Sequence, residues 1–291
     1  MATKRKLERR ISSTEDMASI VGTMKALAAV NVRVFERAKE AIDNYLDTVE
    51  RGLQIALRGQ TGLTTEGPQD AEESLAIFVF GSVQGMCGQF NEHIAQYAAR
   101  VVDEASSRPR VIAMGERVVG RLADQGIATD VQLGLAGQLD ALPNIVDRCI
   151  VQTELLRQEN VDRLVVCYNR QTGRPAYEPS GDLVLPIADR WIEQIRTREW
   201  PTNQLPVALT PMPELLGSLV RQYLFSSFYR ATARSLAAEN AARLAAMQSA
   251  EKNIDERLEE LQSQYNQKRQ AEITEELLDI VGGYTALEKG S

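Results

Sequence analysis

The chain has 291 residues and a formal net charge of −7, from 40 acidic and 33 basic residues. This acidic balance argues against a general nucleic-acid binder, which would usually be basic. A single histidine, His93, makes a histidine-based metal site or a Ser-His-Asp site a poor fit. Aromatic residues make up only 5% of the chain and alanine is abundant, which favours long helices over a compact barrel or sandwich.

The three cysteines (Cys87, Cys149 and Cys167) are far apart and form no CxxC pattern, so we expect reduced thiols and a cytosolic setting. The sequence has no unbroken run of 18 apolar residues, and we therefore expect no membrane-spanning segment. The basic start of the chain lacks the apolar stretch of a secretory signal. Its acids, among them Glu8 and Glu15, are unusual for a transit peptide, so we interpret it as mature structure.

Residues 1–58 are predicted to form one long helix. Its apolar or small residues recur mostly in steps of three, four and seven, which indicates a seam for a partner helix; they are Leu7, Ile11, Ile20, Met24, Leu27, Val34, Ala38, Ile42, Tyr45 and Val49. Asn31 occupies a position on this seam. It could fix the register of a coiled coil as a buried Asn, or lie half-exposed on a loose seam.

A different pattern follows a linker at 59–73, which is rich in glycine and has no periodicity. Residues 74–200 alternate short apolar runs with helical stretches, which predicts a mainly parallel α/β domain. The expected strands are 75–80, 111–114, 164–168 and an edge strand at 183–187, which contains Pro186. The expected helices are 91–105, 116–125 and 142–160.

A proline-rich connection at 201–213 leads to a second long helix at 214–291. A narrow apolar stripe runs along this helix, through Met247, Ala250, Ile254, Leu258, Leu261 and Tyr265. The other faces are charged, and we expect them to be solvated. Because the two long helices bracket the α/β domain, they can pack against each other in antiparallel orientation.

The loop most suggestive of an enzyme is Gly81–Gly88, between the first strand and the next helix. A glycine-rich turn at a helix N-terminus can cradle a phosphate. However, its G-x-x-x-G-x-x-G spacing is neither a dinucleotide fingerprint nor a P-loop, which favours a structural turn. Cys87 could be a low-pKa thiol there, although a small buried hydrophobe is the favoured interpretation. We assign no catalytic, cofactor-binding or metal-binding residue.

Two runs in the last helix carry a family resemblance. Residues 235–253 match S-x-x-(A/S)-E-x-x-A-R-x-x-A-M…N, and residues 265–283 follow Y-N-x-x-R-Q-x-x-I-T-x-E-L-x-E-I-x-x-G with only Asp279 in place of Glu. The loop Gly85-Met86-Cys87-Gly88 with Asn91 is similar to G-L-C-G-x-x-N. In these residues, and in the order of its segments, nearly the whole chain resembles the gamma subunit of rotary F-type ATP synthases.

The chain departs from the family pattern at three places. Val83-Gln84 replace an Asp-Arg pair, Asn31 replaces a lysine, and Tyr284 replaces an alanine. These departures indicate a divergent branch, for which the alternate F-type ATPase of some bacteria, with sodium as a candidate coupling ion, is one candidate. The coupling ion, proton or sodium, stays open.

The resemblance implies a coiled coil around an inserted Rossmann-like α/β domain. It implies a non-catalytic rotor shaft that couples ion translocation to ATP synthesis or hydrolysis. The implied partners are three alpha and three beta subunits, an epsilon subunit and the membrane ring of c subunits. The implied location is peripheral, on the cytoplasmic face of a bacterial inner membrane, with membrane association only through these partners.

The resemblance also implies that Arg269, Gln270, Thr274, Glu276 and Met24 contact the alpha/beta hexamer. Polar and alanine-rich faces suit such a contact because they bind weakly and release, whereas a broad apolar stripe would adhere. Two alternatives remain on the residues alone. The first is an antiparallel coiled-coil hinge or scaffold protein, and the second is a small α/β nucleotide-binding enzyme that uses the Gly81–Gly88 loop.

Overall fold

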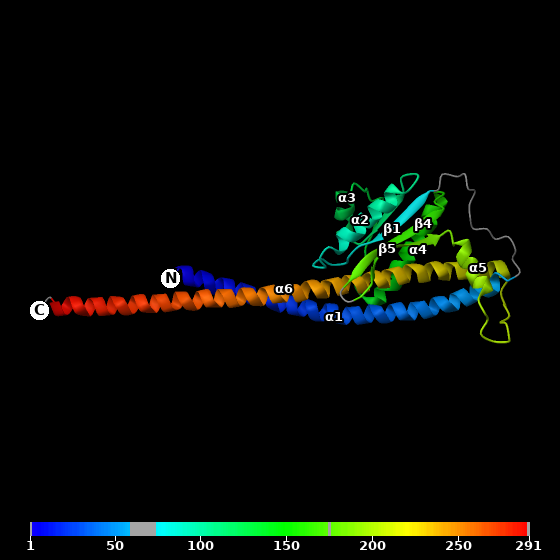
Figure 1. The fold of residues 1–291 in the computed structure, drawn as a ribbon. Helices are drawn as coiled ribbons and strands as arrows, with labels where there is room; N and C mark the ends of the chain where they lie inside the picture. The colour runs from blue at the N-terminus through cyan, green and yellow to red at the C-terminus, as the bar shows by residue number, and fades with distance from the viewer. Residues whose placement is uncertain (1, 59–73, 174–175, 290–291) are drawn as a thin grey trace. The chain divides into compact units, whose positions relative to one another are not determined.

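The computed structural model describes residues 2–58, 74–173 and 176–289, so the predicted linker at 59–73 lies outside the described residues. Two long helices dominate it (Figure 1): α1, Ala2–Ala56, and α6, Met212–Lys289. By its contacts the chain divides into two units. We call the described parts of 1–27 and 244–291 the helix-pair unit, and residues 28–243 the α/β unit.

In the helix-pair unit, α1 and α6 run antiparallel. Near its start α1 contacts the far end of α6, with Lys4 Nζ 3.9 Å from Glu272 Oε2. Further along α1, Lys25 contacts Glu251, much earlier in α6, at 2.5 Å. The predicted stripe of α6 is the contact seam, because Met247 and Leu261 are buried and the four other stripe residues are half-buried.

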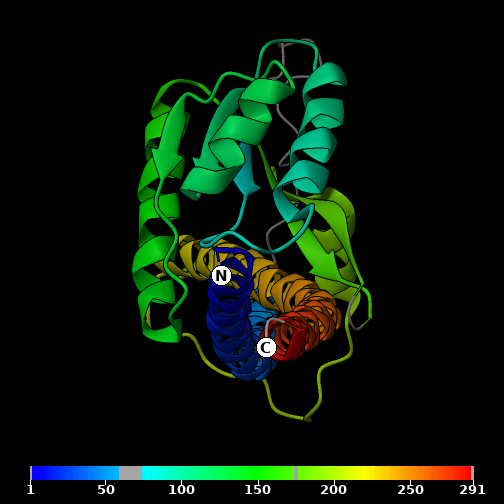
Figure 2. The same cartoon turned by 90° about the vertical axis from the view of Figure 1, so that its left-hand side faces the viewer.

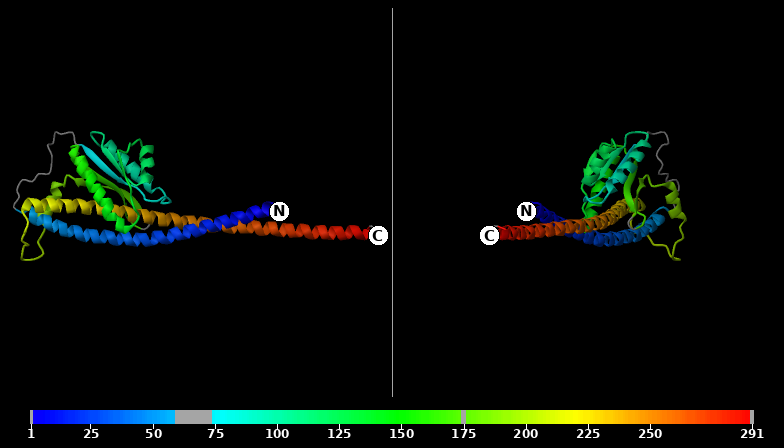
Figure 3. Two further views of the ribbon diagram at one scale, coloured as in Figure 1. Left: turned by 180° about the vertical axis from the view of Figure 1, so that it is seen from behind. Right: turned by 60° about the vertical axis from the view of Figure 1, so that its left-hand side comes forward.

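The same pairing occurs within the α/β unit, where the second half of α1 lies beside the first half of α6 (Figure 3). Tyr45 Oη donates a hydrogen bond to Gln222 Oε1 at 2.7 Å, and Asn31 Nδ2 donates to Asn240 Oδ1 at 3.3 Å. Between these two polar contacts, Phe35 and Ala38 of α1 pack with alanines and Leu236 of α6. The prediction of two long antiparallel helices is confirmed.

A five-stranded sheet forms the centre of the α/β unit, with strand order β3-β2-β1-β4-β5. The strands are β1 Leu75–Phe80, β2 Arg110–Met114, β3 Val131–Leu133, β4 Arg163–Gln171 and β5 Tyr177–Leu185. The shorter helices are α2 Phe90–Asp103, α3 Glu116–Asp124, the 3₁₀ turn η1 Leu139–Ala141, α4 Leu142–Gln158 and α5 Asp189–Thr197. The β4–β5 pairing is antiparallel and the other pairings are parallel.

Each face of the sheet has its own core, because side chains alternate along a strand. On β1, Ile77 and Val79 pack with α2 and α3, whereas Phe78 and Phe80 pack with α4, α1 and α6. Phe78 meets Phe228 of α6 edge to face, with ring centroids 5.0 Å apart. Figure 2 gives the view along the long helices. The sheet is thus covered by the long helices on one side, and this contact positions the loop described below.

Several element predictions are confirmed and others need correction. The strands at 75–80, 111–114 and 164–168 are present, and the strand ending before Pro186 is an edge strand as expected, although it begins at Tyr177. The sequence prediction missed the short strand β3 and the helix α5. Three residues of β3 carry too little pattern to be recognised.

The predicted seam of α1 is partly wrong. Ile20, Leu27 and Tyr45 are exposed, whereas Val32, Phe35, Leu46 and Leu53 are buried. The helix carries apolar residues on more than one face, so steps of three and four fit several stripes. In the α/β unit the sheet and α6 select the buried stripe, since Leu46 and Leu53 belong to the same core as Phe78.

Hydropathy gives a further difference from the sequence expectation. Within the described residues, one helix, Lys4–Ala56, contains an 18-residue window with mean hydropathy 1.3 and is long and apolar enough to cross a membrane by length and composition alone. The expectation counted only unbroken apolar runs and therefore missed a segment in which alanine and apolar residues surround a few polar ones. Only 17% of that window is buried within the protein.

Candidate partner-contact surfaces

The end of α6 carries four of the five residues expected to contact partners. Arg269, Gln270, Thr274 and Glu276 are all exposed on the described helix. Arg269 and Glu276 are seven residues apart and Gln270 and Thr274 four apart, so the structure places them on two adjacent strips. Thr274 Oγ1 donates to the Gln270 carbonyl at 2.9 Å. Their side chains are therefore available to a partner.

This surface is less polar than expected. Five large apolar residues on the same stretch are exposed, between 45% and 68%: Ile273, Leu277, Leu278, Ile280 and Val281. Exposed apolar residues that cluster rather than scatter mark interaction sites. The end of α6 is thus a mixed surface with charged and apolar strips side by side.

Glu276 lies in a different setting from Arg269. It lines a hollow of about 420 Å³ together with Lys4, Arg5 and Glu8 of α1 and with acidic residues of α6. Tyr265 Oη donates to Glu8 Oε1 at 3.1 Å nearby, and Lys4 lies over the Tyr265 ring. Glu276 therefore faces the start of α1 and sits opposite cationic side chains of its own chain.

Met24, the fifth expected contact residue, is half-buried on α1. Its neighbour Lys25 forms hydrogen bonds with both carboxylate oxygens of Glu251, at 2.5 and 2.6 Å. Met17, Ile20 and Leu27, on the same part of α1, are more than half exposed. The structure thus places Met24 beside a second apolar surface, on the other helix of the pair.

The Gly81–Gly88 loop is tied to α6 by a buried ion pair. Glu239 and Arg243 are 1% and 5% exposed and bond to each other one helical turn apart. Glu239 accepts the backbone N–H groups of Val83 at 2.9 Å and Gln84 at 3.3 Å. Arg243 donates to the carbonyls of Gln84 at 2.9 Å and Gly85 at 3.2 Å. The backbone donors that could have cradled a phosphate thus bind a carboxylate of the same chain.

The first residues of the loop, Gly81 and Ser82, are also fixed by contacts with the neighbouring helices. Asn91, in the first turn of α2, accepts the Ser82 N–H and donates to the Ser82 hydroxyl, both at 2.8 Å. Gly81 is required for close packing, because an added Cβ would lie 2.4 Å from the Cβ of Val118. Gly88 has φ +62°, a conformation that favours glycine. These features confirm the interpretation of the loop as a structural turn.

Cys87 is a buried hydrophobe in this loop. It packs with Phe90, Ala238 and Ala242, and burial raises the pKa of its thiol above the usual value. A thiol with a raised pKa is protonated at neutral pH and is a poor nucleophile. The low-pKa alternative for Cys87 is therefore wrong.

Asn31 of α1 is connected to the Glu239–Arg243 ion pair through Asn240. Its partner Asn240 is buried, donates to the Leu236 carbonyl at 2.8 Å and accepts from Arg243 at 3.4 Å. Asn31 itself is half-buried, as one of the two interpretations of the sequence expected, and it also bonds to the partner helix. Two of the three departures from the family pattern, Asn31 and Val83-Gln84, thus come together at one place in the structure.

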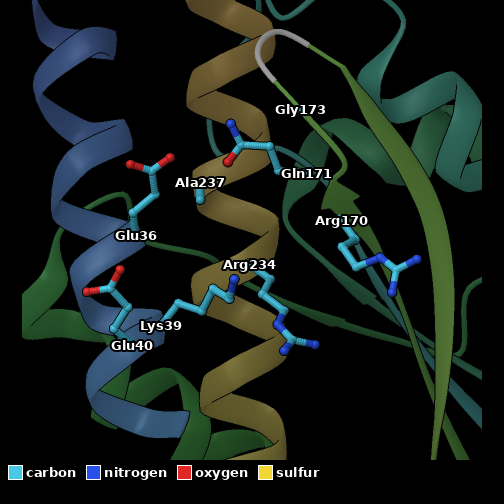
Figure 4. Close-up of a pocket in the computed structure, with 8 residues that line it drawn as sticks. All are labelled: Glu36, Lys39, Glu40, Arg170, Gln171, Gly173, Arg234 and Ala237. Carbon is cyan, nitrogen blue, oxygen red and sulfur yellow. The ribbon is translucent and has the colours of Figure 1, made fainter.

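A charged pocket of about 550 Å³ lies between α1, α6 and the end of β4 (Figure 4). Its lining includes Glu36, Lys39 and Glu40 of α1, with Arg170 and Arg234 opposite them. Both arginines already have partners, since Arg170 donates to Glu178 at 2.6 Å and Arg234 to Tyr168 Oη at 3.1 Å. With acidic side chains opposite and the cations engaged, we assign this pocket no ligand.

Comparison with known proteins identifies the family. A family model described as ATP synthase matches residues 3–287. The ATP synthase gamma chain of Chloroherpeton thalassium is 31% identical over 100% of this chain and 100% of that relative. The chain belongs to the ATP synthase gamma-chain family. Its resemblance, inferred above from motifs, is thereby confirmed.

Solved structures support the fold of this family member. A chain of the Euglena gracilis mitochondrial ATP synthase, from a structure of OSCP, F1 and c-ring in rotational state 3, aligns with TM-score 0.68 and 19% identity over 99% of this chain and 96% of that one. A chain of the rotor of the same enzyme aligns with TM-score 0.64 and 17% identity over 94% and 99%. The predicted fold, an α/β domain between two long paired helices, is confirmed.

Glu239 and Arg243 belong to the family motif at 235–253, but the motif by itself assigns them no role. The signal was available, because a Glu and an Arg four residues apart stand in a run of alanines. Alanine-rich helix faces approach other backbones closely, so charges within such a run need partners. The backbone that Glu239 and Arg243 contact depends on the fold, so the sequence pattern alone could not identify it.

Proposed function

We propose that this chain is the central rotor shaft, the gamma subunit, of an F-type ATP synthase. The full-length 31% identity to a gamma chain carries this proposal. The paired helices support it physically, because two antiparallel helices on a shared seam are stiffer than one. The rotor and c-ring structures that share the fold agree with it.

The two exposed surfaces of the helix-pair unit suit contact with a surrounding ring of subunits. Apolar residues such as Leu278 and Met17 remain exposed on separate helices, and charged residues such as Arg269 lie beside them. Because these residues belong to separate helices, the shaft would present a different contact to each subunit that faces it. Such a shaft would drive identical sites through different states as it turns.

The partners we propose are three alpha and three beta subunits around the helix pair, with epsilon and the c-ring at the α/β domain. Arg269, Gln270, Thr274, Glu276 and Met24 are the proposed hexamer contacts. Arg269 suits a carboxylate partner because its planar guanidinium binds bidentately. Glu276 shares a hollow with Lys4 and Arg5 of α1, so these two cationic residues would take part in its contact with the hexamer. The complex would stand on the cytoplasmic face of a bacterial inner membrane.

We further propose that the chain itself carries no ATP chemistry. Support comes from the Gly81–Gly88 loop, whose N–H groups at Val83 and Gln84 are engaged by Glu239. A nucleotide phosphate would have to displace a buried carboxylate that is also paired with Arg243. This observation weighs against the α/β nucleotide-binding enzyme as the alternative.

Co-purification tests this function. The tagged full-length chain, expressed with its native neighbours, should retain alpha and beta subunits in a three-to-three ratio with one copy of itself. A chain that purifies alone and binds ATP would favour the enzyme alternative. A chain that purifies alone and binds DNA with strong salt dependence would favour the coiled-coil hinge. Either result would contradict the rotor assignment.

A further inference from the structure

We propose that Glu239 and Arg243 form a stiff joint that fixes the orientation of the α/β domain on α6, so that torque passes between them. The inference rests on the proposed rotor function for its consequence. Its structural part concerns the loop at residues 82–85 and α6, both within the α/β unit.

The joint is made of charge-assisted hydrogen bonds to backbone. Four of them connect the pair to the loop, at 2.9, 3.3, 3.2 and 2.9 Å. Hydrogen bonds with an ionised partner are roughly twice as strong as neutral ones. They strengthen further where water is excluded, and both side chains are almost fully buried. Because the contacts go to N–H and C=O groups on consecutive residues, they define direction as well as distance.

The surroundings of the pair favour stiffness. Cys87 of the Gly81–Gly88 loop and Phe90, the first residue of α2, pack with Ala238 and Ala242, which flank the ion pair on α6. On the domain side, Asn91 anchors the loop to α2. On the other side, Asn31 and Asn240 extend the network to α1. The pair thus links three segments: the loop, α6 and α1.

Other contacts between the domain and the long helices differ in kind. Most are apolar, such as the packing of Phe78 on Phe228, and apolar contacts tolerate sliding because they are not directional. The bond from Arg234 to Tyr168 is directional, but it joins two side chains. Gln54 of α1 donates to the backbone carbonyl of Arg198, after α5, and therefore holds a different segment to the other long helix. Glu239 and Arg243 are thus the residues through which α6 binds the backbone of the loop between β1 and α2, and we assign the orientation of the domain on α6 to them.

Distance measurements on the isolated full-length chain test the joint. Spin labels at Ser106→Cys, after α2, and at the exposed Ser218→Cys on α6 would report the domain's position against the helix. The native cysteines are buried, so labelling is selective. Glu239→Gln keeps the volume but removes the charge, and we expect it to broaden the distance distribution about twofold. Arg243→Lys keeps the positive charge but loses the planar guanidinium and its several N–H donors, and it should broaden the distance distribution less.

Two controls separate the joint from general destabilisation. Glu251→Gln removes the partly exposed ion pair with Lys25 and should leave the distribution unchanged. Ala242→Cys places a thiol in the cluster that contains Cys87, and oxidation to a disulfide should narrow the distribution again in the Glu239→Gln background. If the label-distance distributions of Glu239→Gln and Arg243→Lys both keep the wild-type width, the proposal of a stiff joint is overturned. It is equally overturned if a formed disulfide fails to narrow a broadened distribution.

The functional consequence is measured in the assembled complex. The hexamer is immobilised and a probe is attached at Ser106→Cys. When both chains assemble into the complex to the same extent, the probe should show wider angular fluctuations in the Glu239→Gln chain than in the wild-type chain. If that variant does not assemble, the same comparison uses Arg243→Lys. Wild-type fluctuations in an assembled variant that broadens the label distances would overturn the torque role. Failure of the wild-type chain to assemble would instead refute the rotor function. The spin-label distances measured on the isolated chain would still test the joint.

Discussion

Lys25 of α1 contacts Glu251 of α6 at 2.5 Å, although 226 residues separate them in the chain. This ion pair joins the two antiparallel helices of the helix-pair unit, yet both side chains are partly exposed. Exposed ion pairs typically contribute only ~0.2–1 kcal/mol. We therefore predict that Lys25→Met lowers the free energy of unfolding by less than about 1 kcal/mol, measured by urea titration. A larger loss would mean that this contact, rather than the seam, holds the helices together.

Leu261 should matter far more. It is 1% exposed on a narrow seam with few other buried residues, so truncation leaves a cavity. We predict that Leu261→Ala costs ~2–5 kcal/mol locally and raises hydrogen exchange across 244–281. Leu278→Ala is the matched control, because Leu278 is 66% exposed and its loss should change exchange little. Equal effects of the two variants would contradict the seam assigned here.

Alkaline pH should destabilise the chain through two buried thiols. Burial raises the pKa of Cys149 and of Cys167 from 9.0 to about 12. Between these values the unfolded state binds fewer protons than the folded state, so the free energy of unfolding falls as pH rises. We predict a loss of about 1 kcal/mol per thiol between pH 9 and pH 10, because at pH 9 the unfolded thiol is only half deprotonated.

The control for this prediction replaces both residues. Cys149→Ala with Cys167→Ala should lower stability at pH 8 because methyl-sized cavities form, but should flatten its decline above pH 9. Urea titrations at pH 8, 9 and 10 compare the two slopes. Parallel slopes would show that other groups cause the alkaline loss.

Much of the fold could be predicted because the long helices and the buried strands have strong periodic patterns. The seam of α6 was predictable, since its other faces are charged. The seam of α1 was not, because Ile20 and Val32 look alike in sequence and only the packing of α6 and the sheet buries one of them. The partner of Glu239 could not be predicted, because the loop at Val83 lies 156 residues away.

The proposed contact residues give a prediction on function. Arg269 and Gln270 are exposed, so Arg269→Ala with Gln270→Ala should leave the melting temperature of the isolated chain within about 2 °C of wild type. In the assembled complex, the same double variant should reduce ATP turnover coupled to ion movement. Lys268→Ala with Gln267→Ala, exposed neighbours outside the proposed set, serve as the matched control. Normal ATP synthesis in the first variant would refute the contact assignment.

Rotation tests the central claim most directly. The hexamer would be immobilised through its beta subunits, and a gold nanorod attached to the chain at Ser106→Cys would be followed after ATP addition. The rotor assignment predicts continuous rotation in one direction that stops when ATP is removed. A complex that contains the chain and hydrolyses ATP while the nanorod stays still would contradict it.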